Sequence, residues 1–195
     1  MDFVGSCIVT WPLSQPSHTT VQLNHGNGVF VRVEDTGIDG TAEVAAVGDL
    51  NGDGFDDLIV AKVTDNFCED CTVLSPIIGV QLSNGDGTFK APVYYNTATR
   101  YQVLPKAVVG DFNGDGKLDV AILSTAGPGP DALTIFLNTG SGGLRQVENY
   151  LLPSTTHLPT LLPTMAAGDL NGDDKTDLAV VYLNPGQPET NKVAP

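Results

Sequence analysis

The chain has 195 residues, enough for one ordinary domain or two small ones with a real hydrophobic core. Its formal net charge of −14 excludes nucleic acid and anionic membranes as default partners, and it contains no run of 18 apolar residues that could span a membrane. With 22 glycines, 13 prolines and 41 % hydrophobic residues, the composition predicts many short strands and tight turns, and hence an all-β fold.

The first turn signal in the chain is HGNGVF, residues 25–30, where Gly and Asn lie between two apolar runs. This pattern predicts a β-hairpin. The preceding stretch MDFVGSCIVTWPL has neither a basic n-region nor a small-residue cleavage site, so no signal peptide is visible in the chain.

Residues 41–102 are predicted to form four consecutive strands. A short strand of small apolar residues, VAAV, leads into the acidic stretch GDLNGDGFDD, and the apolar run LIVAKV follows as the second strand. The third strand, IIGVQL, runs into the hairpin signal SNGDGTF, and TFKAPVYY is the fourth strand.

The same order recurs in residues 103–160 and begins again in residues 161–195. The acidic stretch returns as GDFNGDGKLD and GDLNGDDKTD, so its first acids, Asp49, Asp111 and Asp169, lie 62 and 58 residues apart. Four antiparallel strands that repeat without a helical periodicity predict β-propeller blades. A β-sandwich is the alternative, but it does not require a loop and a hairpin to recur in the same order.

The repeat frame also divides the chain. Asp2-Phe3-Val4 matches Asp57-Leu58-Ile59, where an acidic stretch ends and a strand begins. We therefore expect one repeat domain over residues 1–195, with a partial blade at 1–40, full blades at 41–102 and 103–160, and a partial blade at 161–195. That is an incomplete, open propeller of about three blades, whereas closed propellers have about four to eight. We expect a piece of a larger protein or a shortened gene product, whose open blade edges bind the remaining blades or drive self-association.

The acidic stretches hold 11 of the 23 carboxylates, and this clustering indicates cation binding. Counted from the first acid, oxygen-bearing side chains occupy positions 1, 3, 5 and 9, and position 7 can offer its backbone carbonyl. Hard cations such as Ca²⁺ prefer such mixed oxygen ligands. The candidate metal ligands are Asp49, Asn51, Asp53, Phe55 and Asp57; Asp111, Asn113, Asp115, Lys117 and Asp119; and Asp169, Asn171, Asp173, Lys175 and Asp177.

Position 6 of each loop needs a sharp turn, which we predict to have positive φ. Gly54 and Gly116 suit it, while Asp174 tolerates it less well, so the third of up to three calcium sites is expected to be the weakest. The loop is not an EF-hand, because position 12 falls within a β-branched run instead of being a bidentate Glu. The alternative is an acidic, Asx-rich turn that binds nothing tightly.

The motif G-D-[LF]-N-G-D-[GD]-x-x-D-[LV], followed by N-G-D-G-T-F-x-x-P, resembles the FG-GAP/VCBS-type repeat of integrin α-subunit propellers and of many bacterial secreted or surface proteins. The resemblance implies a seven-bladed propeller with Ca²⁺ in the loop between the first two strands of a blade, ligated by positions 1, 3, 5 and 9. The chain lacks a literal Phe-Gly…Gly-Ala-Pro, to which KAPVYY is the nearest approach.

The cysteines, histidines and aromatic residues do not indicate a catalytic site. Cys68 and Cys71 flank two acids in the polar link between strands two and three, which favours a short loop disulfide over a redox motif, and Cys7 fits a core strand. The histidines share no repeat position, and we predict that they are surface residues. The aromatic residues fit either a carbohydrate or peptide site or the interiors and interfaces of the blades. The histidines are His18, His25 and His157, and the aromatic residues are Trp11, Tyr94, Tyr95 and Tyr101.

Three functions are compatible with this sequence. The first is a calcium-binding, non-catalytic scaffold for adhesion or for a protein or carbohydrate ligand, located outside the cell or at its surface. The second is part of a propeller enzyme such as a polysaccharide lyase, dehydratase or phospholipase, although no convergent acid–base set is visible. The third is an architectural spacer.

Overall fold

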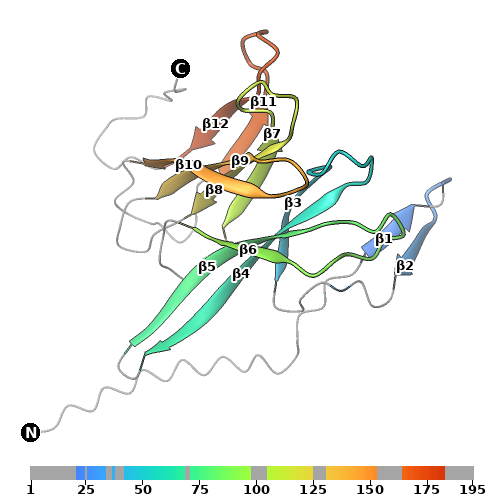
Figure 1. Cartoon of the computed structure of the whole chain (residues 1–195), viewed down its shortest axis with the longest axis horizontal. Helices are drawn as coiled ribbons and strands as arrows, with labels where there is room; N and C mark the ends of the chain where they lie inside the picture. Colours follow the sequence, from blue (N-terminus) through green and yellow to red (C-terminus); the bar gives the residue numbers. More distant parts are fainter. Residues whose placement is uncertain are drawn as a thin grey trace, which may run out of the picture.

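The structure, a computed structural model, describes residues 21–24, 26–33, 37, 42–68, 71–97, 105–124, 131–152 and 164–182. Every regular element in this part of the chain is a strand, and every strand pair is antiparallel (Figure 1). The strands form separate sheets, none of which closes into a barrel. The predicted all-β fold with open, four-stranded blades is therefore confirmed. No helix in the described part is long and apolar enough to cross a membrane.

The first four-stranded sheet contains β3 (Glu43–Gly48), β4 (Asp57–Cys68), β5 (Cys71–Gln81) and β6 (Val93–Asn96), in that spatial order. The strands β4 and β5 are longer than the sequence predicts and form an arm that extends beyond β3 and β6 (Figure 1). Strand β6 is shorter than predicted, because Pro92 has no N–H to donate to a neighbouring strand.

The second sheet repeats this order with β7 (Lys106–Gly110), β8 (Asp119–Ser124), β9 (Ala132–Asn138) and β10 (Leu144–Leu151). Its fourth strand, in which LRQVENY stands where the first blade has KAPVYY, pairs with β9 along its length, with a register shift between Gln146 and Glu148. Pairing with the third strand, not a particular motif, is what keeps this segment extended.

Two further hairpins lie at the ends of the described chain. Strands β1 (Val21–Asn24) and β2 (Phe30–Val33) form the hairpin predicted from HGNGVF, and β11 (Thr164–Gly168) pairs with β12 (Asp177–Val181). The blade boundaries expected from the sequence, between residues 40 and 41, 102 and 103, and 160 and 161, lie outside the described residues.

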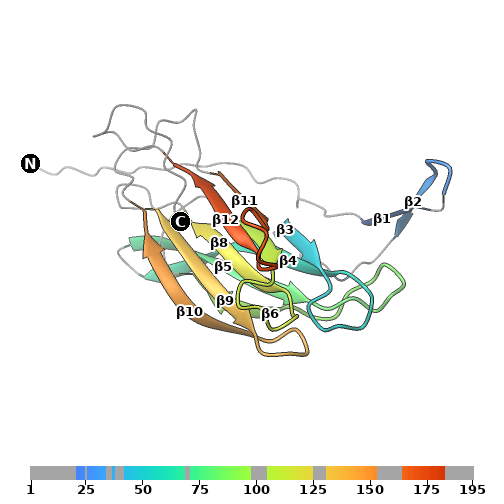
Figure 2. The ribbon, with the colours of Figure 1, turned by 90° about the horizontal axis from the view of Figure 1, so that it is seen from above.

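The first strands of the repeats are neighbours in space. Strand β7 lies between β3 and β11, so the short strands of small residues gather where the sheets converge (Figure 1). Seen from above, the sheets stack on one another, and the β1–β2 hairpin lies at the far end of the array (Figure 2).

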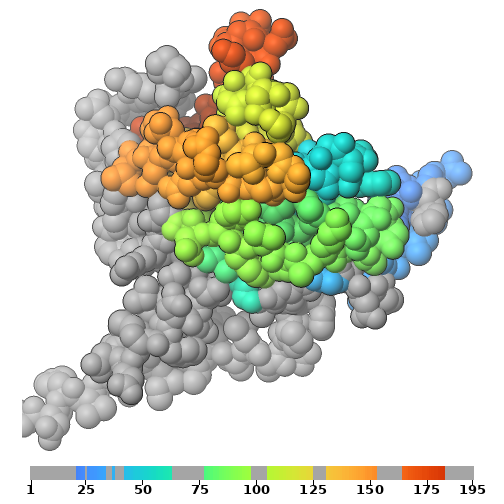
Figure 3. Space-filling view, in the orientation of Figure 1, coloured from blue at the N-terminus to red at the C-terminus, as the bar shows by residue number. Residues whose placement is uncertain are grey.

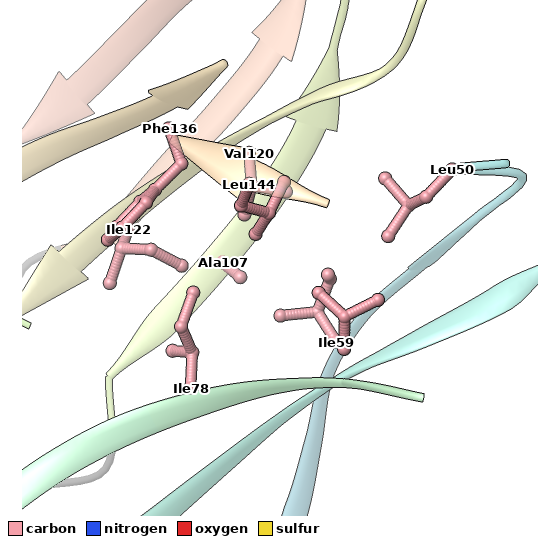
Figure 4. Close-up of a cluster of buried hydrophobic side chains, with 9 residues drawn as sticks. Leu50, Ile59, Ile78, Ala107, Val120, Ile122, Phe136 and Leu144 are labelled. Atoms are coloured by element: carbon pink, nitrogen blue, oxygen red, sulfur yellow. The ribbon is translucent and has the colours of Figure 1, made fainter. Parts of the chain in front are cut away.

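The main hydrophobic core fills the space between the two four-stranded sheets (Figure 4). Strand β8 is buried on both faces: Val120 and Ile122 point into this core, whereas Ala121 belongs to a second cluster that includes Met165 and Leu178 of the β11–β12 hairpin. A strand that is apolar at consecutive positions is thus explained by blades packed against both of its faces. The main core consists of Leu50, Ile59, Ile78, Val80, Ala107, Val120, Ile122, Phe136 and Leu144.

The glycines that precede the first and second acidic loops allow neighbouring blades to approach closely. A Cβ atom on Gly48 would lie 2.9 Å from Leu118, and one on Gly110 would lie 2.5 Å from Thr176. Leu118 and Thr176 occupy the same position, the eighth, in the following loop. Only glycine leaves room for this contact, so a motif residue that looks like part of the loop belongs to the blade interface.

Candidate metal centres in the acidic loops

The three acidic loops connect the first strand of a repeat to the second, at β3–β4, β7–β8 and β11–β12. All three begin from the same register, in which the glycine before the loop is opposite the acid at position 9. Figure 1 shows the loops in cyan, yellow-green and red, at the same end of their strands. Their residues from position 3 to position 7 are exposed, apart from the half-buried Asn51, and are therefore accessible to an ion from solvent.

The acid at position 1 organises the backbone of each loop. In the first loop, Asp49 Oδ1 accepts the N–H of Gly52 at 2.7 Å, and its Oδ2 accepts the N–H of Gly54 at 2.9 Å. Asp111 and Asp169 accept the equivalent N–H groups with matching oxygens. The Gly54 N–H is the main cause that lowers the pKa of Asp49, and the Gly172 N–H does the same for the pKa of Asp169.

The backbone conformation at position 6 is the one that the sequence predicts. Gly54 has φ of 89° and Gly116 has φ of 81°. Asp174 takes the same left-handed conformation with φ of 63°, where a residue with a Cβ is strained and glycine is not. The third loop thus has the curl of the other two despite the substitution.

The side chains at positions 3 and 5 also turn toward the loop backbone. Asn51 Oδ1 accepts the N–H of Asp53 at 2.8 Å, and Asp53 Oδ1 accepts the N–H of Phe55 at 3.0 Å. The second carboxylate oxygen of Asp53 accepts the Asn51 side-chain amide at 2.9 Å.

In the second loop, a lysine side chain contacts the carboxylate at position 5. Lys117 Nζ donates to Asp115 Oδ2 at 2.8 Å, whereas in the first loop the equivalent oxygen accepts a side-chain amide. This side-chain hydrogen bond is the main cause that lowers the pKa of Asp115 and raises the pKa of Lys117. The first and second loops therefore differ in how easily an external cation could reach position 5.

The acid at position 9 has a structural role that the sequence analysis missed. Asp57 is fully buried, and it accepts the N–H of Leu50 at 3.0 Å and the N–H of Ser83 at 2.8 Å. It thereby joins its own loop to the start of the hairpin that follows the third strand. The signal that could have revealed this is the polar residue that opens each hairpin, Ser83 in one blade and Asn138 in the next.

Asp119 makes the same bonds in the second blade, to Phe112 N at 3.1 Å and to Asn138 N at 2.8 Å. Burial raises the pKa of both Asp57 and Asp119, although the backbone N–H groups oppose this effect. The like charges of Asp49 and Asp53 raise the pKa of Asp57 further. A positive charge in the loop would relieve this repulsion.

In the third loop, Asp177 accepts the N–H of Leu170 at 2.9 Å and is only partly buried. Among the described residues, no third strand pairs with β12, and Asp177 receives no counterpart of the second backbone N–H that donates to Asp57 and Asp119. In the first two loops, the acid at position 9 therefore bonds both to its own loop and to the following hairpin, whereas in the third loop it bonds only to its own loop.

The donor set of each loop fits a hard cation by its chemistry, because carboxylate, amide and carbonyl oxygens lie within nine consecutive positions of a tightly curled backbone. The oxygens that accept N–H groups keep lone pairs for a further partner. Among the described residues, no three His, Cys, Asp or Glu side chains gather closely enough to hold a metal by themselves. A bound ion would thus depend on Asn51, Asn113 or Asn171 and on backbone oxygens as well.

The aromatic residues divide between the described and undescribed parts. Tyr95 is a contact between blades: its hydroxyl accepts the N–H of Leu144 at 3.0 Å, and its ring meets Phe136 edge to face. Tyr94 packs over Gly79 of its own sheet. The predicted roles of the remaining aromatic and histidine candidates concern residues outside the described part, which are Trp11, Tyr101, His18, His25 and His157.

The sequence analysis places the two cysteines of the first blade in a link between strands, but the structure places them within the strands themselves. Cys68 ends β4, Cys71 begins β5, and the two are register partners at the tip of the arm. The strands continue this far because Thr, Phe and Val residues favour extended structure on both sides of the tip. The disulfide stays a prediction, and Cys7 lies outside the described residues.

Comparison with known proteins agrees with the repeated geometry. A family model described as an FG-GAP-like repeat matches residues 4–60, 78–122 and 111–180. A search of curated proteins finds no significant match.

Proposed function

Because the chain belongs to the FG-GAP-like repeat family, we propose that it is a calcium-stabilised, non-catalytic repeat scaffold that holds a protein or carbohydrate ligand outside the cell or at its surface. The observation that carries the proposal is the repetition of one loop geometry three times, with the same oxygen-bearing positions and the same positive φ at position 6. In every copy the exposed carboxylate at position 5 accepts the backbone N–H of position 7, and its oxygens keep lone pairs for a cation.

In this proposal the residues at positions 1, 3, 5, 7 and 9 hold Ca²⁺. The ion supplies positive charge to a loop where several carboxylates repel one another, and it ties the first two strands of a blade together. The scaffold therefore gains stability in the millimolar calcium of extracellular fluid, which suits open sites of moderate affinity. The third site is the weakest, because Asp174 takes the place of a glycine.

Isothermal titration calorimetry of the chelator-treated chain with calcium tests this proposal. We expect binding at the three loops, with one site lost in each of the variants Asp49→Asn and Asp111→Asn, since each removes a charge from position 1 of one loop. Titration of magnesium under the same conditions is the control. Heat that is the same for both ions and for the variants would mean that the loops are only acidic turns.

The lysine of the second loop allows a sharper prediction. Lys117 neutralises Asp115, so Lys117→Gln is expected to raise calcium affinity at that site by roughly two- to fivefold, the range of an exposed ion pair. The matched control is Lys90→Gln, which removes the same charge from an exposed position outside the acidic loops. Equal effects of the two variants would point to general electrostatics and not to competition for the Asp115 carboxylate.

A further inference from the structure

A single buried side chain joins the first acidic loop to the second. Asn138, which is 3 % exposed, donates from Nδ2 to the carbonyl of Leu50 at 2.7 Å and to the carbonyl of Leu118 at 3.0 Å. Leu50 is position 2 of the first loop, between the proposed ligands at positions 1 and 3. Leu118 is position 8 of the second loop, between the proposed ligands at positions 7 and 9. An amide nitrogen carries two hydrogens, so this one side chain holds the backbones of both loops at once.

The remaining polar groups of Asn138 are bonded within the second blade. Its backbone N–H donates to Asp119 at 2.8 Å, and its Oδ1 accepts the N–H of Gly140 at 2.8 Å. Asp119 is position 9 of the second loop and one of its proposed ligands. A change in the position of this carboxylate therefore acts on the residue that holds Leu50 in the neighbouring blade.

The first blade shows that the bridging amide is not needed for the hairpin turn itself. Ser83 is the counterpart of Asn138, and it keeps the equivalent bonds, because its N–H donates to Asp57 at 2.8 Å and its Oγ accepts the N–H of Gly85 at 3.1 Å. A hydroxyl has one hydrogen and cannot donate to two carbonyls at the same time. The substitution Asn138→Ser therefore removes the bridge but keeps the bonds of the turn.

The bond between Asn138 and Leu50 is shielded from water. Leu50 is 2 % exposed and belongs to the main core, in the same cluster as Leu144 of the second blade (Figure 4). Figure 3 shows the first loop, in cyan, directly beside the orange hairpin of the second blade. A buried carbonyl that loses its donor pays the full desolvation penalty, so this contact constrains the first loop strongly.

The second and third loops are linked by a different bond. The backbone N–H of Thr176 donates to the carbonyl of Asp111 at 3.0 Å. The side chain of Lys175 also lies close to the second loop, since its Cε would be 3.6 Å from a Cβ on Gly114. The two loops are neighbours in Figure 3, the third in red and the second in yellow-green. The first pair of loops is thus joined through a side chain, and the second pair through the backbone.

We propose that neighbouring loops bind their cations cooperatively, and that Asn138 is the positioning residue that carries this coupling between the first and second loops. The coupling depends on the proposed calcium function, whose sites it regulates. A cation in the second loop fixes Asp119 and the backbone around Leu118, and hence Asn138. The first loop then has less conformational freedom to lose when it binds its own cation, so its affinity rises. By linkage, a cation in the first loop raises the affinity of the second by the same factor.

Calcium titration followed by NMR tests this coupling, because one glycine amide reports on each loop: Gly54 on the first, Gly116 on the second and Gly172 on the third. In the variant Asp111→Asn, which removes the second site, the calcium affinities of the first and third loops should both fall about fivefold, the lower end of typical coupling between sites. With Asn138→Ser added, the first loop should no longer respond to the loss of the second site. The third loop should still respond, because its link to the second loop is a backbone bond.

The third loop is the internal control for this experiment, since a misfolded second blade would disturb both of its neighbours. Asn138→Ser changes no charge, so a purely electrostatic influence of Asp111 on the first loop would persist in it. A first loop whose affinity ignores Asp111→Asn, or falls equally with and without Asn138→Ser, would overturn the coupling and leave the calcium proposal intact. Amide signals that do not respond to calcium in any loop would overturn both.

Discussion

Replacing Asp57 or Asp119 by alanine should destabilise the fold more than removing any other acid of the loops. Each of these side chains is fully buried and accepts two backbone N–H groups from different segments. Alanine leaves both donors without a partner, and an orphaned buried group costs about 1–3 kcal/mol, so we expect a loss of about 2–5 kcal/mol in the free energy of unfolding. Urea denaturation in EDTA at neutral pH measures this loss without any contribution from a bound cation.

Asp177→Ala is the natural control for this prediction. Asp177 occupies the same loop position, but it is partly exposed and, among the described residues, accepts one backbone N–H, that of Leu170, which is itself exposed. Its loss should cost no more than about 1 kcal/mol. If all three variants lost the same stability, the bond between the loop and the following hairpin would not be what makes Asp57 and Asp119 important.

Calcium is expected to raise the melting temperature of the chelator-treated chain substantially. A ligand at ten times its dissociation constant stabilises the folded state by about 1.4 kcal/mol per site, so three occupied loops would contribute about 4 kcal/mol. For a chain of this length, each kcal/mol corresponds to about 2–4 °C, so the expected rise is about 8–16 °C. Differential scanning calorimetry at millimolar calcium measures it.

Two controls separate specific binding from screening of the −14 net charge. Sodium chloride at matched ionic strength should give a much smaller rise, because screening acts on all acids alike. Magnesium should also be less effective, because it demands a near-octahedral site and gives up its water reluctantly. A rise of the same size in all three salts would contradict the cation-site proposal.

Local sequence was sufficient to predict features that depend on local geometry. The loop from Asp49 to Asp57, the positive φ at Gly54 and the hairpin at HGNGVF all follow from residues within a few positions of one another. The strand order could be predicted for the same reason, since consecutive strands joined by short turns pair with each other.

Features that depend on the neighbouring blade were not predictable in this way. Leu50 and Leu170 occupy the same motif position, yet one is 2 % exposed and the other 62 %. Gly48 looks like part of a turn but makes room for Leu118 from the next repeat. The bonds of Asp57 to Ser83 and of Asn138 to Leu50 span 26 and 88 residues. Local pattern cannot specify such partners, because they depend on how complete sheets pack.

The proposal that the acidic loops bind calcium is tested most directly by a crystal structure of the chain. The crystals are grown with calcium, and the data are measured at a wavelength where calcium scatters anomalously. We predict an anomalous peak in the first and second loops and a weaker one in the third, each about 2.3–2.6 Å from oxygens of positions 1, 3, 5, 7 and 9. Loops without a peak, in which Asp49 and Asp53 still contact only backbone N–H groups and the Asn51 amide, would contradict it.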